Sequence, residues 1–383
     1  MAEEKKKKKS VEDILKAIQG DVLSPQDRAW YSTGSFVLDT AIANGEKGVQ
    51  GGFPGGLISM LWGEPSAGKS TMSMHSAADA QKQGKVVIYV DFERSFSGEY
   101  ANRLGVDTTP FSEGGQFILY EPDYLEDAFE YLTALVADKK MRKTLGLIIF
   151  DSIASMSSSF SNEELNKHDR IGVEASSLKR CLKPFATKIS GSDIAVVLLN
   201  QVRMNLKKKF DWEPKWITPG GMAPQHSSSL TLQVGRGAKM TKKVVNPATG
   251  MEEEVRAGHL VRVNIMKNKI TGENHRTISI PFFQNLGIDL ATTIIDVGES
   301  FGLIAGAGKS ARAISKDYLP GLSEDFSCRY KSHLRDTLAS NDKVLKAFEI
   351  TVAAELRRRY EDMRAKEIDT KNLGEVKEEK EDK

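Results

Sequence analysis

From about Ser35 onwards, continuous apolar runs alternate with segments in which apolar residues recur every three to four positions. The runs predict buried strands, and the three-to-four spacing predicts amphipathic helices. The predicted strands are 57–62, 85–93, 117–120, 145–150 and 194–200, and the predicted helices are 71–83, 126–138 and 175–189. Buried strands separated by helices are typical of a mostly parallel sheet covered on both faces. We therefore predict an α/β fold.

The pattern changes after residue 200, where apolar segments follow one another without a helix between them. Residues 229–234, 260–267 and 276–283 have the composition of strands. Because no helical segment separates them, we expect antiparallel strands that extend the same sheet. Beyond Ile288 the chain turns helical and more polar, which predicts a small C-terminal α/β domain.

Ser10 precedes a short segment, Val11–Ile18, with apolar residues at 11, 14, 15 and 18. This spacing predicts a helix with Ser10 as its N-cap. A lone helix of this length is unstable in water, so it must pack on the core or on a neighbouring molecule. The predicted organisation is a basic segment with a subunit-contacting helix (1–34), a core (35–287), a small C-terminal domain (288–360) and a charged, disordered tail (361–383).

The composition is that of a soluble protein. The chain has 383 residues, 40% of them hydrophobic, and a formal net charge of +2. No apolar run is long enough to span a membrane, and the charged N-terminus does not resemble a secretory signal. We therefore expect a cytoplasmic protein without membrane partners. Cys181 and Cys328 lack CxxC partners, which argues against a disulfide framework or a cysteine metal site.

The strongest chemical signal is a glycine-rich segment between a predicted strand and a predicted helix. Its residues are Gly63, Glu64, Pro65, Ser66, Ala67, Gly68, Lys69, Ser70 and Thr71. They match the pattern G-x-x-x-x-G-K-[ST], in which backbone N–H groups and a helix N-terminus bind phosphates. We expect Lys69 to reach the β- and γ-phosphates of ATP, and Ser70 to supply a hydroxyl to Mg²⁺.

Two further strands end in carboxylates. Asp151 follows the apolar run 145–150, where proteins with such a phosphate loop hold Mg²⁺ through water. Asp91 and Glu93 lie at the end of the predicted strand 85–93, and strand alternation points both in the same direction. Either could orient the water that attacks ATP, and their residue types leave this choice open, with Glu93 preferred.

Two segments have the composition of nucleic-acid-binding loops. Residues 202–229 lack a regular pattern and interleave cations with aromatic residues, and 156–172 is a second, less basic loop. Cations follow phosphates, and aromatic rings stack on bases. The predicted DNA-binding residues are Arg203, Met204, Lys207, Lys208, Lys209, Phe210, Trp212, Lys167 and Arg170.

Five motifs in order resemble the RecA-type recombinases. They are 31–39 (with Tyr31–Ser35 and Leu38-Asp39), the phosphate loop 63–71, 91–107 (with Asp91-Phe92-Glu93), 200–204 (Asn-Gln-Val-Arg-Met) and 267–270 (Lys-Asn-Lys-Ile). The resemblance extends from about residue 31 to about 355 and is that of a distant bacterial or phage-encoded relative. It implies a RecA-type P-loop ATPase core with a mostly parallel sheet, antiparallel extension strands and small flanking domains.

The resemblance also implies roles for particular residues. Glu93 would activate water, and Tyr100 would stack on adenine. Gln201 would sense the γ-phosphate and signal its state to the DNA-binding loop. Lys267 and Lys269 would reach the phosphates of a neighbouring subunit, as arginine fingers do in other ATPases.

The implied function is an ATP-dependent recombinase that forms a helical filament on single-stranded DNA. It would hydrolyse ATP with Mg²⁺ as a DNA-dependent ATPase and exchange strands with a homologous duplex. Single-strand-binding and mediator proteins are further candidate partners. The expected location is the cytoplasm, on the nucleoid, or the host cytoplasm for a phage-encoded protein.

Two other functions share this core, and two features depart from the family pattern. A ring-shaped motor or helicase would need an arginine finger and an appended domain, and the Lys267–Lys269 pair and the small C-terminal domain argue against it. The second alternative is a non-hydrolysing mediator, and Lys69, Asp151 and Glu93 argue against that function. Residues 224–227 replace the larger apolar residues that usually follow the Gly220-Gly221 pair. In the family this joint between loop and strand is implicated in subunit coupling, so the resemblance does not imply that coupling here. The tail is not strongly acidic, so autoregulation by the tail is not implied either.

Overall fold

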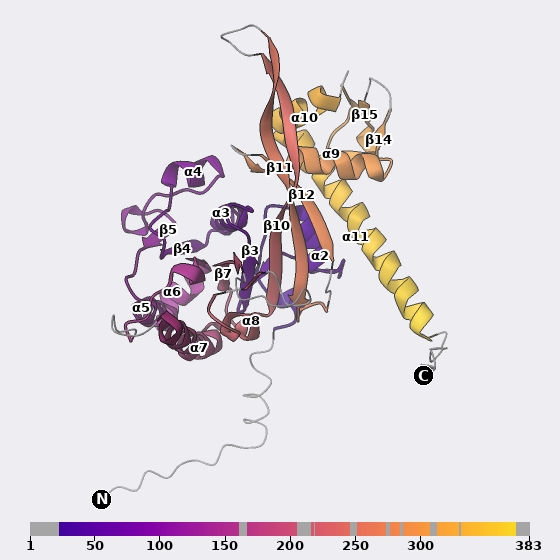
Figure 1. The fold of residues 1–383 in the computed structure, drawn as a ribbon. Helices are drawn as coiled ribbons and strands as arrows, with labels where there is room; N and C mark the ends of the chain where they lie inside the picture. The colour runs from indigo at the N-terminus through magenta and orange to yellow at the C-terminus, as the bar shows by residue number, and fades with distance from the viewer. Residues whose placement is uncertain are drawn as a thin grey trace, which may run out of the picture. The chain divides into compact units, whose positions relative to one another are not determined.

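The computed structural model describes residues 23–160, 167–204, 216–217, 219–245, 251–272, 276–283, 286–306, 312–328 and 331–372. These divide into two compact units (Figure 1). The first contains the described residues up to Tyr31 and from Phe53 to Val234, and the second contains Ser32–Gly52 and the residues from Gly235 onwards. The predicted helix Val11–Ile18 lies outside the described residues.

The first unit is built on a parallel sheet with the strand order β10-β3-β7-β6-β4-β5. Its strands are β3 (Ile58–Gly63), β4 (Val86–Asp91), β5 (Phe117–Tyr120), β6 (Leu145–Asp151), β7 (Ala195–Gln201) and the start of β10 (Leu230–Val245). All residues of β4 and β6 are buried, as their unbroken apolar composition predicts. The carboxyl ends of β3, β4, β6 and β7 therefore meet at one edge, where they can form a ligand site.

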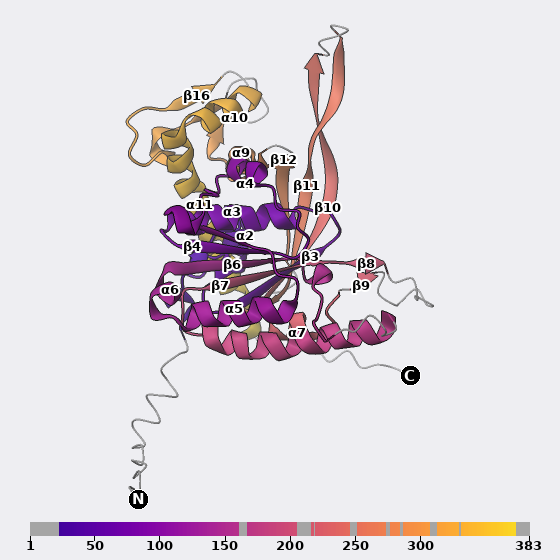
Figure 2. The same cartoon turned by 90° about the vertical axis from the view of Figure 1, so that its left-hand side faces the viewer.

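Helices cover both faces of this sheet. They are α3 (Lys69–Lys82), α4 (Gly98–Arg103), α5 (Leu125–Ala137), α6 (Lys139–Thr144), α7 (Lys167–Ile189) and the short α8 (Ala223–Ser227). Figure 2 shows α3 on one face of the sheet and α5 with α7 on the other. Phe129 of α5 and Phe185 of α7 pack with Phe150 of β6 in the core. A two-stranded pair, β1 (Trp30–Tyr31) with β2 (Phe53–Pro54), completes the unit.

The second unit contains antiparallel strands and helices. The strands β11 (Glu252–Asn268), β12 (Thr277–Phe283) and β13 (Gly287–Ile288) continue the sheet from β10. A small sheet follows, formed by β14 (Ile304–Ala305), β15 (Arg312–Ile314) and β16 (Phe326–Cys328). The helices are α2 (Phe36–Ile42), α9 (Leu290–Ser300), α10 (Lys331–Ser340) and α11 (Asp342–Asn372). Asn268 at the end of β11 donates from Nδ2 to the carbonyl oxygen of Ile42 (2.8 Å), which joins β11 to α2.

The predicted fold class, a mostly parallel sheet extended by antiparallel strands, is confirmed. Several boundaries differ from the prediction. The strand expected over 85–93 ends at Asp91, and β10 and β11 extend far beyond the expected 229–234 and 260–267. The additional parts of β10 and β11 contain a mixture of polar and apolar residues, so the sequence has no apolar run there that would predict a strand. Helix α11 continues to Asn372, into the segment where the sequence predicted a tail.

The two predicted loops are more regular than expected. Helix α7 begins at Lys167, inside the expected loop 156–172. Within 202–229, β8 (Arg203–Met204) pairs with β9 (Trp216–Ile217), and α8 follows. Such short pairs and helices are held by tertiary contacts and leave little periodic signal in a sequence. Among the helices that the structure describes, none is both long and apolar enough to cross a membrane.

Candidate functional site

The glycine-rich segment 63–71 forms a tight loop between β3 and α3. A Cβ atom on Gly63 would lie 1.8 Å from the carbonyl oxygen of Val234 on β10, so glycine is needed at this position. Ser66 and Gly68 both have positive φ angles, of 54° and 102°. Backbone of this shape turns successive N–H groups toward one side, as a phosphate site requires. The loop therefore has the form that its sequence predicts.

Lys69 is buried beneath this loop. Its Nζ donates to the carbonyl oxygens of Gly63 (3.1 Å) and Glu64 (2.8 Å). These bonds hold the ammonium group against the backbone of the loop, next to the first turn of α3. A fixed cation at a helix N-terminus suits an anionic ligand.

Ser70 in the first turn of α3 and Asp151 at the end of β6 are brought together. Ser70 Oγ donates to Oδ2 of Asp151 (2.8 Å), and the hydroxyl of Tyr89 donates to the same oxygen (2.6 Å). Burial raises the pKa of Asp151, helped by the charges of Glu93 and Asp91, while the two hydrogen bonds oppose the shift. A hydroxyl and a carboxylate in contact are oxygen ligands of the kind that Mg²⁺ binds, so these residues fit that ion.

The structure separates the roles of Asp91 and Glu93. The Asp91 carboxylate accepts from the backbone N–H groups of Glu93 (3.0 Å), Ser95 (2.8 Å) and Phe96 (2.7 Å). Asp91 thus holds the loop that follows β4. Because β4 ends at Asp91, strand alternation does not extend to Glu93 and gives no basis for the expectation that both side chains point the same way.

Glu93 accepts hydrogen bonds at one oxygen from three side chains. Oε1 is bonded by the hydroxyl of Ser152, by the hydroxyl of Ser155 (3.2 Å) and by Nε2 of Gln201 (2.8 Å). Gln201 is the last residue of β7, so the ends of β6 and β7 both contact Glu93. The sequence predicted Glu93 and Gln201 but not the two serines, which carry no motif of their own.

Tyr100 lies on α4, and its hydroxyl is 2.7 Å from Oγ1 of Thr71 on the phosphate-loop helix. The guanidinium group of Arg103 lies 5.7 Å from the centre of the Tyr100 ring. The hydrogen bond holds the Tyr100 ring close to Thr71, the last residue of the segment 63–71. Such a position is compatible with the predicted contact with adenine.

Lys267 and Lys269 belong to the second unit, at and just beyond the end of β11. Burial and the charge of Lys269 lower the pKa of Lys267. Their contact with a neighbouring subunit stays a prediction.

The predicted DNA-binding residues fall partly outside the described residues. Residues 205–215, which contain Lys207, Lys208, Lys209, Phe210 and Trp212, lie between β8 and β9 and are not described. Arg203 and Met204 form β8, and Lys167 and Arg170 lie on α7 rather than in a loop. Asn200 joins the two ends of this segment, since Nδ2 donates to the carbonyl oxygen of Pro219 (2.9 Å).

A basic pocket between α7 and α8 was missed by the sequence analysis. It has a volume of about 730 Å³, and its lining includes Lys179 and Lys183 of α7, Gly220, and His226 of α8. The signal was present in the sequence, because 175–189 contains four cations and no carboxylate. We interpreted that segment only as a helix.

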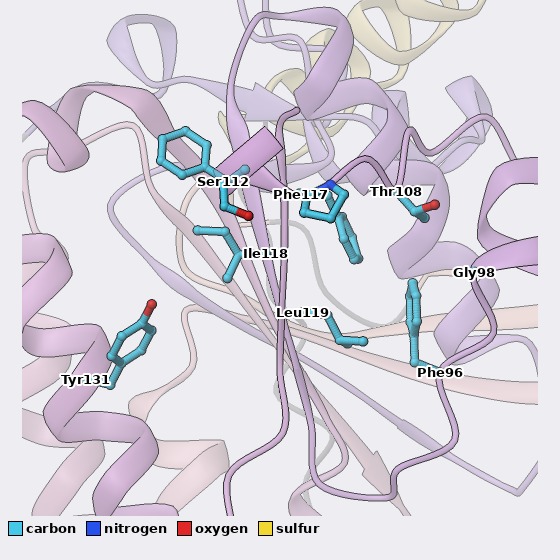
Figure 3. A pocket seen from close by; sticks show the side chains of 10 residues that line it. Phe96, Gly98, Thr108, Ser112, Phe117, Ile118, Leu119 and Tyr131 are labelled. Carbon is cyan, nitrogen blue, oxygen red and sulfur yellow. The ribbon is translucent and has the colours of Figure 1, made fainter. Parts of the chain in front are cut away.

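A second pocket, of about 540 Å³, is mainly apolar and lies beside β5 (Figure 3). Phe96, Phe117 and Tyr131 are among the residues that line it. The rings of Phe96 and Phe117 are stacked with centres 5.3 Å apart. Neither Tyr100 nor the phosphate loop lines this pocket, so it is distinct from the predicted nucleotide site.

The phosphate loop, Asp151 and Glu93 at the ends of parallel strands define a P-loop protein of mixed α/β fold. Residues 7–289 match the family described as the RecA N-terminal domain, and the chain belongs to the RecA family. The chain is 30% identical over 321 residues to Protein RecA of Thermotoga neapolitana, which covers 80% of this chain and 83% of the relative. The predicted resemblance is thus confirmed.

Two further relatives are similar over a slightly shorter length. Protein RecA of Mesoplasma florum is 28% identical over 289 residues, covering 74% of this chain and 76% of the relative. Protein RecA of Mesomycoplasma hyopneumoniae is 29% identical over 284 residues, with the same shares covered.

Proposed function

We propose that this chain is an ATP-dependent recombinase. It assembles as a helical filament on single-stranded DNA, pairs that strand with a homologous duplex and exchanges the strands, with DNA-stimulated hydrolysis of ATP. The observation that supports this most directly is the hydrogen bond between Glu93 and Gln201 beside the phosphate loop. It connects the residue proposed to act on water with the strand that leads into the proposed DNA-binding segment.

Phosphate binding rests on the loop 63–71 and Lys69. The backbone N–H groups and the fixed ammonium would stabilise negative charge that develops during phosphoryl transfer. Ser70 and Asp151 would hold Mg²⁺, which neutralises phosphate charge when it is bound. Tyr100 would contact adenine. Each residue acts by position and charge, as this reaction requires.

Glu93 would orient the attacking water and accept its proton. Its Oε1 is already bonded by Gln201, Ser152 and Ser155, which hold the carboxylate in one place. If Gln201 instead turns toward the γ-phosphate, this bond breaks and the end of β7 is released. ATP would in this way change the segment 202–219, and with it the grip on DNA.

DNA binding rests on the cations. Lys179 and Lys183 line the pocket against α8, and Arg203 begins the segment with Lys207, Lys208 and Lys209. Lys167 and Arg170 lie nearby in sequence on α7. Such cations would follow phosphates, while Met204, Phe210 and Trp212 would contact bases.

Assembly would be head-to-tail, since that type of contact generates a helical filament. Lys267 and Lys269 would reach the phosphates bound by the next subunit. We place the protein in the cytoplasm, on the nucleoid or in a phage host, with single-strand-binding and mediator proteins as partners.

The decisive experiment measures ATP hydrolysis with and without single-stranded DNA, together with electron microscopy of the complex. We expect stimulation by DNA and regular filaments with ATP. Lys69→Ala is the control, because it removes the fixed cation and should lower turnover at least about 100-fold. Near-normal hydrolysis by Lys69→Ala, or hydrolysis indifferent to DNA, would contradict the proposal.

A further inference from the structure

Phe160 presents an exposed aromatic ring at the end of the described segment that follows β6. Its side chain is 58% exposed, which is unusual for phenylalanine. The guanidinium group of Arg180 on α7 lies 5.1 Å from the ring centre, within the range of cation–π attraction. An apolar ring and a cation thus form one small surface.

Hydrogen bonds hold this surface in place. Ser158 Oγ accepts from the backbone N–H of Phe160 (3.2 Å) and donates to Oε1 of Glu126 (2.7 Å). The hydroxyls of Ser158 and Ser177 are 3.0 Å apart, and Arg180 donates to Ser177 (3.1 Å). Both serines are almost fully buried. The ring and the cation are therefore positioned by one network that joins α5, α7 and the segment after β6.

Glu126 is the charged member of this network. Burial acts to raise its pKa, but hydrogen bonds from Ser158 and from the backbone N–H of Ser159 lower the pKa below its ordinary value. An ionised Glu126 accepts hydrogen bonds only, so it orients the Ser158 hydroxyl as a donor. The Oγ atom of Ser158 can then accept the hydrogen bond from the backbone N–H of Phe160.

The charge around this surface favours an anionic partner. Between Ala175 and Ile189, helix α7 contains Lys179, Arg180, Lys183 and Lys188 and no carboxylate. Among the residues that the structure describes, Arg180 has no ion-pair partner within 4 Å; its contacts are Ser177 and the Phe160 ring. A ring beside several cations suits a polymer with flat bases and regularly spaced phosphates.

We propose that Phe160 and Arg180 form a base-stacking site for single-stranded DNA. A nucleobase would lie against the exposed part of the Phe160 ring and the guanidinium group, with the adjoining phosphates along Lys179 and Lys183 of α7. Because every base has a π-face, the site would be tolerant of sequence. This inference rests on the proposed DNA-binding function, and Glu126 serves it as a positioning residue.

The test compares Phe160→Leu, Phe160→Trp and the wild type, using fluorescein-labelled oligo(dT) and an abasic oligonucleotide of the same length, with ATP present. Phe160→Leu keeps an apolar side chain but loses the π-face. We expect it to weaken oligo(dT) binding about five- to 140-fold, the range for one base–aromatic stack. The abasic strand should bind both proteins equally, and Phe160→Trp should restore oligo(dT) binding.

Glu126→Gln supplies the positioning control. It should weaken oligo(dT) binding and leave abasic binding and ATP hydrolysis without DNA unchanged, which a general folding defect would not do. Equal binding of oligo(dT) by Phe160→Leu and the wild type would overturn the stacking site alone. Equal loss on both strands, or loss of assembly without DNA, would identify a contact between subunits instead. A wild type that hydrolyses ATP but binds no oligo(dT) would overturn the proposed function as well.

Discussion

At the scale of single residues, Oε1 of Glu93 is the atom where three strand ends meet. It accepts from Ser152 and Ser155 after β6 and from Gln201 at the end of β7. Removing negative charge there should leave the loop 63–71 intact, because the hydrogen bonds of Glu93 go to Ser152, Ser155 and Gln201 and not to that loop. Hydrolysis and binding can therefore be separated by one substitution.

Glu93→Gln should still bind ATP and DNA but hydrolyse ATP at least about 100-fold more slowly, because an amide is a poor general base. A long-lived complex with DNA is expected, measurable as a slowed dissociation rate in the presence of ATP. Asp91→Asn is the matched control. It weakens the three backbone contacts of the loop and should raise KM for ATP more than it lowers kcat. Loss of nucleotide binding in Glu93→Gln would show that Glu93 has a structural role.

The sequence alone predicted Glu93 but could not separate it from Asp91. Both are carboxylates at the end of an apolar run, and the boundary of β4 decides between them. That boundary depends on Asp91 accepting backbone N–H groups from the following loop, a tertiary detail without a sequence signature. The phosphate loop was predictable because its glycine spacing is imposed locally by backbone shape.

At the scale of elements, α3 combines Lys69, the proposed phosphate ligand, with a partly buried titratable group, His75. Burial, helped by the charge of Lys82, lowers the pKa of His75 to about 4. The folded state therefore favours neutral imidazole, while the unfolded chain takes up a proton near its ordinary pKa of about 6.5. Stability from this group is complete above about pH 6.5 and is lost as the pH falls toward 4.

We expect the wild type to lose up to about 3 kcal/mol of unfolding free energy through His75 between pH 6.5 and pH 4. His75→Gln cannot titrate, so its stability should fall less over the same interval. Urea unfolding at a series of pH values gives the difference between the two proteins, from which carboxylates common to both cancel. A difference that does not change with pH would show that His75 is not buried as a neutral group.

The contributions of helix α7 and of the segment between β8 and β9 to DNA binding can be compared by measuring how the affinity for single-stranded DNA depends on salt concentration. Each lost phosphate contact on a single strand should flatten the log–log slope of affinity against salt by about 0.7. Replacing Lys179 and Lys183 with Ala should thus reduce the slope by up to about 1.4, and replacing Lys207, Lys208 and Lys209 by up to about two. Sequence preference and ATP hydrolysis without DNA should stay as in the wild type.

Binding constants for oligo(dT) across a salt series, with ATP present, provide this measurement. Lys188→Ala is a useful control, because Lys188 is an exposed cation on α7 that does not line the pocket. An unchanged slope for either cluster would mean that its lysines are solvated away from DNA. We missed the basic pocket because we interpreted 175–189 only as a helix, whereas the pocket depends on the packing of α8 against this segment.

At the scale of the whole molecule, the active site that we propose would be shared between neighbouring subunits. The loop 63–71, Asp151 and Glu93 lie in the first unit, and Lys267 and Lys269 lie in the second. If the lysines act on a neighbour, a variant that lacks them and a variant that lacks Lys69 are defective in different halves of the same site. Each can then supply what the other has lost.

Mixing Lys69→Ala with Lys267→Ala/Lys269→Ala should restore hydrolysis that neither protein shows alone. With equal amounts and random head-to-tail assembly, about one quarter of the contacts join two intact halves. The steady-state rate of the mixture, compared with wild type at the same total concentration, should approach that fraction. If the mixture is as inactive as the two separate proteins, the proposal of action on a neighbour is wrong. The two lysines would then act on the phosphate loop of their own chain, or would have no part in hydrolysis.

The hydrogen bond from Asn200 to Pro219 and the β8–β9 pair hold the two ends of the segment 200–219 together. When the two ends of a loop are held together, the length of the loop has little effect on the free energy of unfolding. Doubling the loop length costs about 0.6 kcal/mol of loop-closure free energy. Replacing residues 205–215 with a segment of another length should therefore leave the first unit folded. A transplanted segment from a relative should bring its own DNA preference with it, whereas Asn200→Ala should disturb every such chimera alike.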